Sequence, residues 1–368
     1  MILGLFPELL STGGIQRISQ DTCAVLEEMA ESLGQPCHIF SLNDAKGLHQ
    51  MEVAGRRFVV RGFGKERGHF IRAVLSKVFK TRLLYVAHPN FAPLGLFCKT
   101  LNPRLRYIVT AYGLEVWSPM PLLNRLGLRG AHALTSISDF TARQMVEHQG
   151  VRADKIAIIP CIIREDLLNA NGHGSRATDA PSGPRRMLLT VGRLAASERM
   201  KGLDETIMAL PKVAGAIPET VYVIVGDGDD RQRLEELAKQ HGMADRVVFR
   251  GAVSDEELIG FYKQCDVFLM PSRQEGFGIV FLEAMAFEKP VIGGNHGGTP
   301  EVIADNETGF LVQHGDVDAL AERIIRLLSD DELRRRMGQA GRRRVEERFT
   351  FAPFRRRLID FLTQVQSQ

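Results

Sequence analysis

The sequence predicts an α/β protein of two domains, each with a mostly parallel sheet that helices cover on both faces. Short apolar, β-branched segments alternate with helical segments along most of the chain, and repeated strand–helix units imply parallel strands. The 368 residues exceed the size at which a single core stops growing. Residues 169–186 are rich in Gly, Ser, Ala and Pro, which predicts a linker and a deep interdomain cleft between the two halves.

The first domain is expected to span residues 1–168. Its predicted strands lie at residues 2–6, 38–41, 58–60, 83–87, 107–110 and 133–137. A turn at Gly13 and Gly14 and a helix to about residue 33 follow the first strand. In a parallel sheet the loops after successive strands gather at one edge, so we expect the polar residues of these loops to lie together.

The second domain is expected to span residues 187–349, followed by a C-terminal helix at 350–368. Its predicted strands lie at residues 187–191, 221–225, 247–249, 267–270, 290–293 and 309–312. Ser254 and Glu257 have the spacing of a capping box, which predicts that a helix begins after Ser254.

Composition places the chain among ordinary globular enzymes. No apolar run approaches the roughly 20 residues that span a bilayer, and the first residues lack the basic segment of a signal peptide. The five cysteines are odd in number and have no CxxC spacing, which favours reduced side chains. We therefore expect a cytoplasmic protein.

Basic residues gather in the first half of the chain. Nine of them lie between Arg56 and Arg82, where the one acidic residue is Glu66. Residues 69–83 have the pattern of a basic amphipathic helix, which can lie peripherally on the inner face of an anionic membrane. A sheet-packing helix with a solvated basic face explains the pattern as well. The stretch lacks the interleaved aromatic residues of a nucleic-acid binder, and we expect no nucleic-acid partner.

Two carboxylates and a Gly-rich turn form the most informative segment. Glu275 follows a predicted buried strand, and Glu283 lies on the helix after it. Between them, Gly276-Phe277-Gly278 allows backbone N–H groups to approach a ligand at a helix start, where unpaired donors favour anions and oxygen-rich groups. The segment predicts a sugar-nucleotide site, whereas either Glu alone would be explained as a helix cap or a solvated side chain.

This segment resembles the donor-site signature of family 4 of the retaining glycosyltransferases (glycosyl transferases group 1). Gly297-Gly298-Thr299-Pro300-Glu301 is similar to the family's GGxPE-like stretch, and Arg193 with Lys201 is similar to its GRL and KG pair. The resemblance covers nearly all of the chain, but its specific motifs lie between residues 192 and 301. It implies a GT-B fold of two Rossmann-like domains, with the last helix crossing back to the first domain.

The resemblance also implies roles for individual residues. The catalytic group would be Glu275, which contacts sugar hydroxyls, with Arg193 and Lys201, which clamp the donor diphosphate. Two fixed cations stabilise the charge that develops when the anomeric C–O bond breaks. Glu283 would accept hydrogen bonds from the ribose. The remaining donor-binding positions are Gly276, Phe277, Gly278, Ile279, Gly251, Val253, Gly13 and Gly14.

Asp227 and Asp229 form a DxD pattern that could hold a divalent cation. They follow a predicted strand and precede a helix, where Gly supplies the turn and Asp caps the helix. Because Arg193 and Lys201 already supply two cations for a diphosphate, we interpret the aspartates as caps. We expect neither an essential metal nor another cofactor.

The first domain supplies the candidates near the acceptor and the sugar. Arg17 lies beside the first Gly-rich loop, and His88, Tyr112 and Glu115 follow successive predicted strands. The family commonly has a His where this chain has Tyr112. A phenol donates a hydrogen bond but is not charged near neutral pH, so the departure puts the usual catalytic His in doubt.

We interpret the chain as a retaining glycosyltransferase that moves a sugar from a nucleoside diphosphate to an acceptor hydroxyl. The acceptor would be a glycan, a lipid-linked molecule or a small molecule of cell-envelope polysaccharide, lipopolysaccharide or glycolipid synthesis. An epimerase or a phosphorylase on the same scaffold is one alternative. A weakly catalytic nucleotide-sugar binding protein is another, which the Tyr112 departure motivates.

Overall fold

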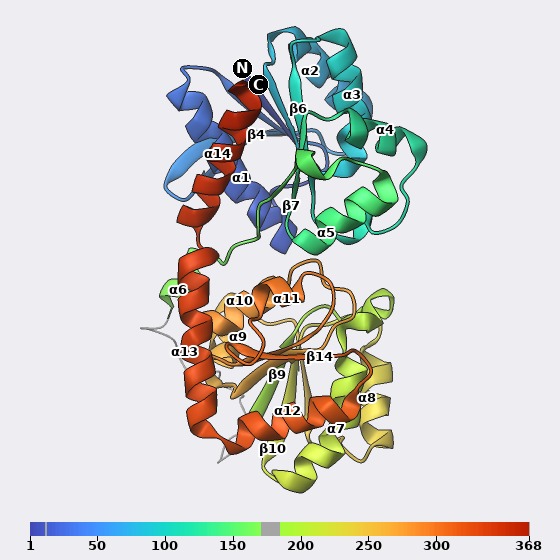
Figure 1. Ribbon diagram of the computed structural model, residues 1–368, viewed down its shortest axis with the longest axis vertical. Helices are drawn as coiled ribbons and strands as arrows, with labels where there is room; N and C mark the ends of the chain where they lie inside the picture. Colours follow the sequence, from blue (N-terminus) through green and yellow to red (C-terminus); the bar gives the residue numbers. More distant parts are fainter. Residues whose placement is uncertain (12, 171–184, 368) are drawn as a thin grey trace. The chain divides into compact units, whose positions relative to one another are not determined.

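The computed structural model describes residues 1–11, 13–170 and 185–367, and most of the predicted linker lies outside these ranges. The chain forms two compact units, Met1–Ile162 with Phe351–Gln368, and Ile163–Thr350. Each unit has one sheet with helices on both faces (Figure 1). Residues 163–168, assigned above to the first domain, cluster with the second unit, and the last helix, α14 (Phe351–Ser367), clusters with the first.

The first unit contains an eight-stranded sheet in the order β3-β4-β2-β1-β5-β6-β7-β8. All neighbouring strands are parallel except the β3–β4 hairpin. The strands are β1 (Ile2–Phe6), β2 (Cys37–Ser41), β3 (Gly47–Val53), β4 (Arg56–Gly62), β5 (Leu83–Val86), β6 (Arg106–Ala111), β7 (Ala133–Ser136) and β8 (Ile156–Ile158). Chain direction across the sheet reverses between β1 and β5, so their carboxyl ends form a crevice of the kind that binds ligands.

Side chains alternate along β1, so neighbouring residues of this strand contact helices on opposite faces of the sheet. Gly4 lies under Leu26 of α1 (Gly14–Ser32), and α14 packs on α1. Leu3 and Leu5 point to the opposite core, which three helices and a short helical turn cover. These are α2 (Arg67–Lys77), η1 (Val78–Lys80), α3 (Ala92–Leu101) and α4 (Leu122–Gly130).

The second unit contains a wholly parallel six-stranded sheet in the order β11-β10-β9-β12-β13-β14. The strands are β9 (Arg186–Val191), β10 (Thr220–Val225), β11 (Val247–Gly251), β12 (Val267–Met270), β13 (Val291–Gly294) and β14 (Gly309–Val312). Leu269 faces a core under α7 (Leu203–Ala216) and α12 (Val317–Ser329), whereas Phe268 meets Phe281 of α10 (Ile279–Ala286) on the other face. Direction reverses between β9 and β12.

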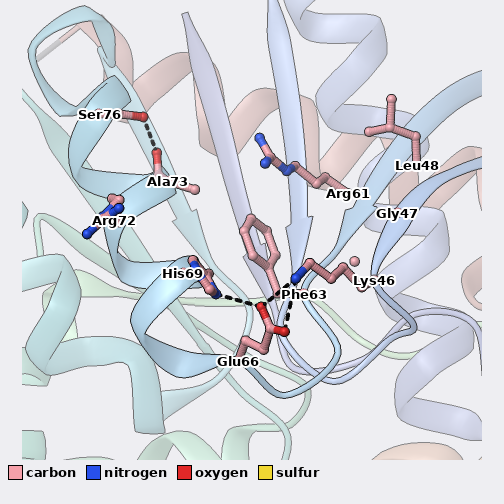
Figure 2. Close-up of a pocket in the computed structure, with 11 residues that line it drawn as sticks. Lys46, Gly47, Leu48, Arg61, Phe63, Glu66, His69, Arg72, Ala73 and Ser76 are labelled. Carbon is pink, nitrogen blue, oxygen red and sulfur yellow. Dashed lines mark hydrogen bonds and ion pairs between the residues drawn. The ribbon is translucent and has the colours of Figure 1, made fainter.

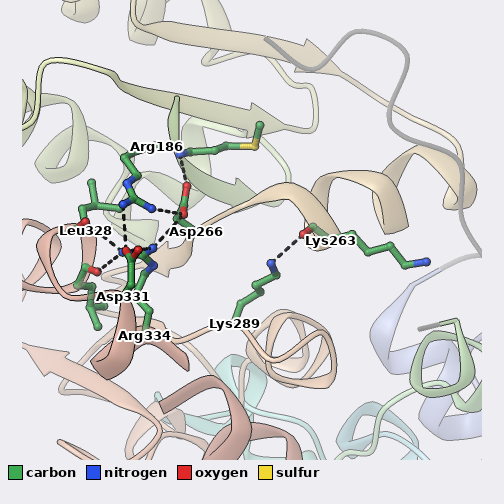
Figure 3. A network of polar contacts seen from close by, with 9 residues as sticks. Arg186, Lys263, Asp266, Lys289, Leu328, Asp331 and Arg334 are labelled. Atoms are coloured by element: carbon green, nitrogen blue, oxygen red, sulfur yellow. Dashed lines mark hydrogen bonds and ion pairs between the residues drawn. The ribbon is translucent and has the colours of Figure 1, made fainter. Parts of the chain in front are cut away.

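A partly buried polar network ties the start of β9 to the start of α13 (Asp331–Arg348) (Figure 3). Asp266 accepts the Met187 N–H at 2.8 Å and pairs with Arg186 at 3.3 Å and with Arg334 at 3.6 Å. Arg186 and Arg334 also pair with Asp331, at 2.9 and 2.5 Å. These ion pairs offset the cost of partly removing the charged groups from water.

Most predicted strands are confirmed, but the sequence analysis missed β3 and β8. Most residues of β3 are exposed or only partly buried, and β8 has three residues at a sheet edge. The helix predicted at 69–83 is observed as α2 and η1, and Phe79, placed on its apolar face, is 75% exposed. The predicted capping box at Ser254 and Glu257 is confirmed at the start of α9 (Asp255–Gln264). Among the described residues, no helix has the length and hydropathy needed to cross a bilayer.

Candidate functional site

The candidate donor site is built on the two loops that follow β9 and β12, the adjacent strands at which the second sheet reverses direction. Gly202, at φ 82°, packs so closely on Pro271 that an added Cβ would lie 2.5 Å from the Pro271 carbonyl oxygen. The Met200 carbonyl accepts the Arg273 N–H at 2.7 Å and the Ser272 hydroxyl at 3.0 Å. The two loops are therefore held together before any ligand binds.

One carboxylate, Glu198, binds both candidate diphosphate-binding cations. Its Oε2 lies 2.6 Å from Lys201 Nζ, and its Oε1 contacts the Arg193 guanidinium. Lys201 is largely buried, with 19% of its side chain exposed, and lies over Gly192, whereas Arg193 is 79% exposed. Glu198 interrupts the short helix η6 (Ala196–Lys201) with a non-helical backbone. The two cations therefore share one counterion on one loop.

Glu275 lies in the β12 loop within reach of Lys201. Burial raises the pKa of its carboxyl group, while the Lys201 charge and hydrogen bonds from the N–H groups of Phe277 and Gly276 oppose that rise. Gly278, at φ 95°, precedes α10 and provides no side-chain cap, so the first-turn N–H groups from Ile279 onward have no side-chain partner there. Phe277 itself is buried and meets Phe349 edge-on.

Glu283 lies on α10 and is held by a neighbour that sequence reasoning did not single out. The Tyr262 hydroxyl donates to Glu283 Oε2 at 2.7 Å. Burial raises the pKa of Glu283, and the Tyr262 hydrogen bond and the Arg164 charge partly offset the rise. Because Tyr262 belongs to α9, 21 residues earlier, no local pattern could have indicated the pair.

The two glycines of the GGTPE stretch, Gly297 and Gly298, pack closely against the backbone of the Glu275 loop. An added Cβ on Gly297 would lie 2.2 Å from the Glu275 carbonyl oxygen, and one on Gly298 would lie 2.1 Å from that of Gly276. The Gly298 N–H donates to the Glu275 carbonyl at 2.8 Å. Arg344 of α13 in turn donates to the Glu301 carbonyl at 2.8 Å.

Two further predicted donor-binding positions, Gly251 and Val253, lie at the end of β11 and just after it. Gly251 adopts φ 70° and bridges Gly226, and Val253 is partly buried. Arg250 lies over the Phe261 ring at 5.6 Å. Its Nε and Nη2 atoms are buried and have no hydrogen-bond partner among the described residues.

The helix-cap interpretation of the DxD pattern is wrong. Asp230 precedes α8 (Arg231–Gln240) but makes no side-chain cap, and it pairs with Arg233 at 2.6 Å and Arg199 at 2.9 Å. Asp229 instead accepts the Ala196 N–H at 2.8 Å. Asp227 accepts the next N–H, that of Gly228. Asp229 and Asp230 therefore anchor the loop that bears Arg193.

No group of three or more His, Cys, Asp and Glu side chains within the described ranges is placed to hold a metal ion. That the site needs no metal stays a prediction.

The candidates of the first unit lie at the carboxyl edge of its own sheet. Gly13 precedes α1, and Arg17 is exposed on its first turn. Burial lowers the pKa of His88, and the Glu115 charge opposes this, so the two side chains lie near one another.

Tyr112 is directed away from solvent. It is 5% exposed, and its hydroxyl is 3.1 Å from the Ser19 hydroxyl of α1. Burial raises its pKa well above the ordinary value. The place of Tyr112 near the sugar stays a prediction, as do those of Arg17, His88 and Glu115.

Comparisons with known proteins agree with this arrangement. A family model described as glycosyl transferases group 1 matches residues 175–344. A GDP-mannose-dependent alpha-(1-6)-phosphatidylinositol monomannoside mannosyltransferase of Mycobacterium tuberculosis is 33% identical over 287 residues, 74% of this chain and 73% of the relative. The chain belongs to the group 1 glycosyltransferases.

Solved structures share the fold over nearly the whole chain. A glycosyltransferase from Rickettsia africae superposes with a TM-score of 0.78 at 21% identity, over 99% of this chain and 98% of that one. Anabaena HepE in complex with UDP superposes with a TM-score of 0.72 at 18% identity, over 99% of each chain. The two parallel-sheet, Rossmann-like units are those of a GT-B glycosyltransferase.

Proposed function

We propose that the protein is a retaining glycosyltransferase that transfers a sugar from a nucleoside diphosphate to an acceptor hydroxyl of a cell-envelope polysaccharide, lipopolysaccharide or glycolipid. The observation that carries the proposal is the cation pair Arg193 and Lys201, which is joined through the β9 and β12 loops to Glu275. Donor loops of this composition suit a ligand with an anionic centre and hydroxyl groups at its end.

The chemistry follows from where charge develops. As the bond between the anomeric carbon and the diphosphate oxygen breaks, its electron pair goes to the diphosphate, and two fixed cations stabilise that charge. Arg193 suits a bidentate contact with phosphate oxygens, and Lys201 acts as a point charge. Glu275 would accept hydrogen bonds from sugar hydroxyls and Glu283 from the ribose, while the acceptor oxygen bonds to the anomeric carbon and its proton passes to the departing diphosphate.

A glycolipid acceptor is supported by the name of the mannosyltransferase relative, which acts on a phosphatidylinositol monomannoside. GDP-mannose is accordingly the first donor to test. Retention of configuration is supported by the motif resemblance. It is checked by determining the anomeric configuration of the product by NMR.

Peripheral membrane contact is part of the proposal. The distribution of unpaired charges and exposed apolar side chains favours one surface for this contact. Of the basic stretch, Arg56 pairs with Glu31 at 2.8 Å and Arg57 with Glu52 at 2.8 Å, so these two arginines of β4 are neutralised. Exposed Phe79 and Lys80 in η1 instead combine an apolar ring with a positive charge, as an interfacial segment requires. Contact with the inner face of a membrane would be made there.

Donor binding tests the proposal directly. A thermal-shift panel of nucleoside diphosphate sugars should give a rise in Tm for the true donor, because ligand binding to the native state adds stability by mass action. An assay for released nucleoside diphosphate with and without acceptor extract then separates transfer from epimerisation or binding alone. Activity that vanished under chelation and returned with Mg²⁺ would contradict the proposed metal independence.

Turnover of two variants tests the site assignment. Lys201→Ala and Glu275→Ala should each lower kcat by roughly a hundredfold, the loss expected for one preorganised charge-stabilising group. Arg246→Ala, a change on the loop before β11, is the control for general damage to the unit. Full activity of either site variant would remove that residue from the mechanism.

A further inference from the structure

A cavity lies in the first unit. Its volume is about 670 Å³, within the roughly 300–1,000 Å³ of small-molecule sites. The β4 strand, the loop before β3 and helix α2 form its walls (Figure 2). Four nitrogen-bearing side chains line it, Lys46, Arg61, His69 and Arg72.

Among the described residues that line the cavity, Glu66 has the one carboxylate, which is already paired with two side chains. Glu66 accepts two hydrogen bonds from Lys46 at 3.0 Å and one contact from His69 at 2.6 Å (Figure 2). Arg61 on β4 and Arg72 on α2 have no ion-pair partner among the described residues, and Arg61 lies over the Phe63 ring at 5.2 Å. Two guanidinium groups on different walls are thus left without a counterion.

The surrounding chain strengthens the positive potential. Residues 67–114 contain eight Lys and Arg and not one Asp or Glu. A concave site lined by one sign of charge concentrates ligands of the opposite sign. The lining also includes apolar Leu48, Phe63 and Ala73, so an organic group can occupy the cavity beside an anion.

The cavity is part of the ligand-binding edge of its sheet. An added Cβ on Gly62, the last residue of β4, would lie 2.0 Å from the Ala45 carbonyl oxygen, which fixes the strand end against the loop. Asp44, next in that loop, accepts the Leu9 N–H at 2.8 Å and the Leu10 N–H at 3.1 Å. The cavity wall is therefore joined to the loop between β1 and α1.

We propose that this cavity binds a phosphate ester, with Arg61 and Arg72 gripping the phosphate and the apolar wall contacting its organic group. Guanidinium groups suit phosphate because their fork of donors matches two of its oxygens. That the ester belongs to the acceptor rests on the proposed transfer reaction. Binding of the ester does not depend on that reaction. The phosphate source is either a soluble ester or a lipid headgroup.

Titration calorimetry of the full chain with glycerol 3-phosphate and with inorganic phosphate tests the site. Arg61→Gln and Arg72→Gln should each weaken binding of glycerol 3-phosphate by about tenfold, the effect of one charge-assisted hydrogen bond. Arg104→Gln is the matched control, because Arg104 is an exposed arginine of the same basic segment at the amino end of β6. Equal affinities in all four proteins, or an equal loss in Arg104→Gln, would overturn the proposal.

Vesicle sedimentation distinguishes the two sources. Vesicles of phosphatidylcholine with 30 mol% phosphatidylinositol, about the anionic content that gives a measurable surface potential, are compared with pure phosphatidylcholine. The phosphate belongs to a lipid headgroup if the Arg61→Gln, Arg72→Gln double variant no longer binds vesicles and glycerol 3-phosphate competes with vesicles for the wild type. Soluble-ester binding without vesicle binding identifies a free ester. Nucleoside diphosphate titrated into the same samples reports the donor site separately, so failure of one proposal does not imply failure of the other.

Discussion

Glu198 holds two cations that the donor diphosphate would need. Its carboxylate contacts Arg193 and Lys201, so a diphosphate bound at the proposed site would compete with an internal anion for the same charges. On the proposed function, this contact would hold Lys201 in place and weaken donor binding.

Replacement of Glu198 by Gln should therefore tighten nucleoside diphosphate binding, by roughly tenfold if one ionic contact is removed from the competition. Calorimetric Kd values for the wild type and the variant measure the effect. Glu236→Gln, on the exposed side of α8 and paired with Lys239, controls for the change in net charge. Weaker binding in Glu198→Gln would mean that Glu198 chiefly orients the cations.

The two candidate site glutamates should give the reaction an acid limb displaced toward neutral pH. Burial raises the pKa of both Glu275 and Glu283, and each accepts a hydrogen bond from a donor hydroxyl more strongly when it is ionised. Activity should therefore fall as pH falls, beginning above the ordinary glutamate value. A kcat/KM profile measures this limb, and Tyr262→Phe, which removes the hydrogen bond to Glu283, should move it further upward. A limb at the ordinary value would contradict the assignment.

At the scale of elements, prediction succeeded where burial decided structure. Apolar runs of four to six residues identified β1, β12 and β14 with their observed bounds, because strands buried on both faces leave a continuous apolar signal. The β3 hairpin strand has exposed positions along much of its length, so that signal is absent. The aspartates before α8 were misassigned because the partner of Asp229, the Ala196 N–H, is 33 residues away.

The candidate site likewise has features that local sequence predicts and features that it does not. The glycines of the loops could be predicted because turns and close backbone contacts restrict residue type, whereas Lys201 was assigned from the motif resemblance, and the roles of Glu275 and Lys201 stay predictions. Tyr262, the counterion role of Glu198 and the burial of Tyr112 depend on side chains meeting across elements. The spacing of residues along the sequence does not indicate such contacts between elements.

Loss of the network at Asp266 should destabilise the second unit. Asp266→Ala removes the acceptor of a backbone N–H and leaves Arg186 and Arg334 with Asp331 alone, which costs about 1–3 kcal/mol of unfolding free energy. Urea unfolding followed by circular dichroism measures it. Asp318→Ala, which breaks the exposed pair with Lys212, should change stability by no more than about 0.5 kcal/mol. Equal effects would show that the network contributes no more than a surface pair.

At the scale of the whole molecule, the two units carry titratable groups of opposite effect. His132 in the first unit has a pKa lowered to about 4, chiefly by burial and then by the charges of Lys99 and Arg106. Its Nδ1 accepts the Tyr107 N–H at 3.3 Å, a bond that protonation there would break. In the second unit, the raised pKa of Glu275 and Glu283 means that the native state there binds protons more readily than the unfolded chain does.

Acidification should therefore weaken the first unit through His132. An unfolded His has a pKa near 6.5, so between that value and about 4 the unfolded state binds the proton and the native state does not, and stability falls as pH falls. The loss from pH 7.5 to pH 5 should be roughly 2 kcal/mol. Trp117, the single tryptophan of the chain, lies in this unit and reports its urea transition by fluorescence. In His132→Asn, whose amide oxygen can still accept the Tyr107 N–H, the loss between the two pH values should shrink by that amount, whereas His49→Asn, at a partly exposed position of β3, should retain it. An unchanged loss in His132→Asn would assign the acid sensitivity of the first unit to other groups.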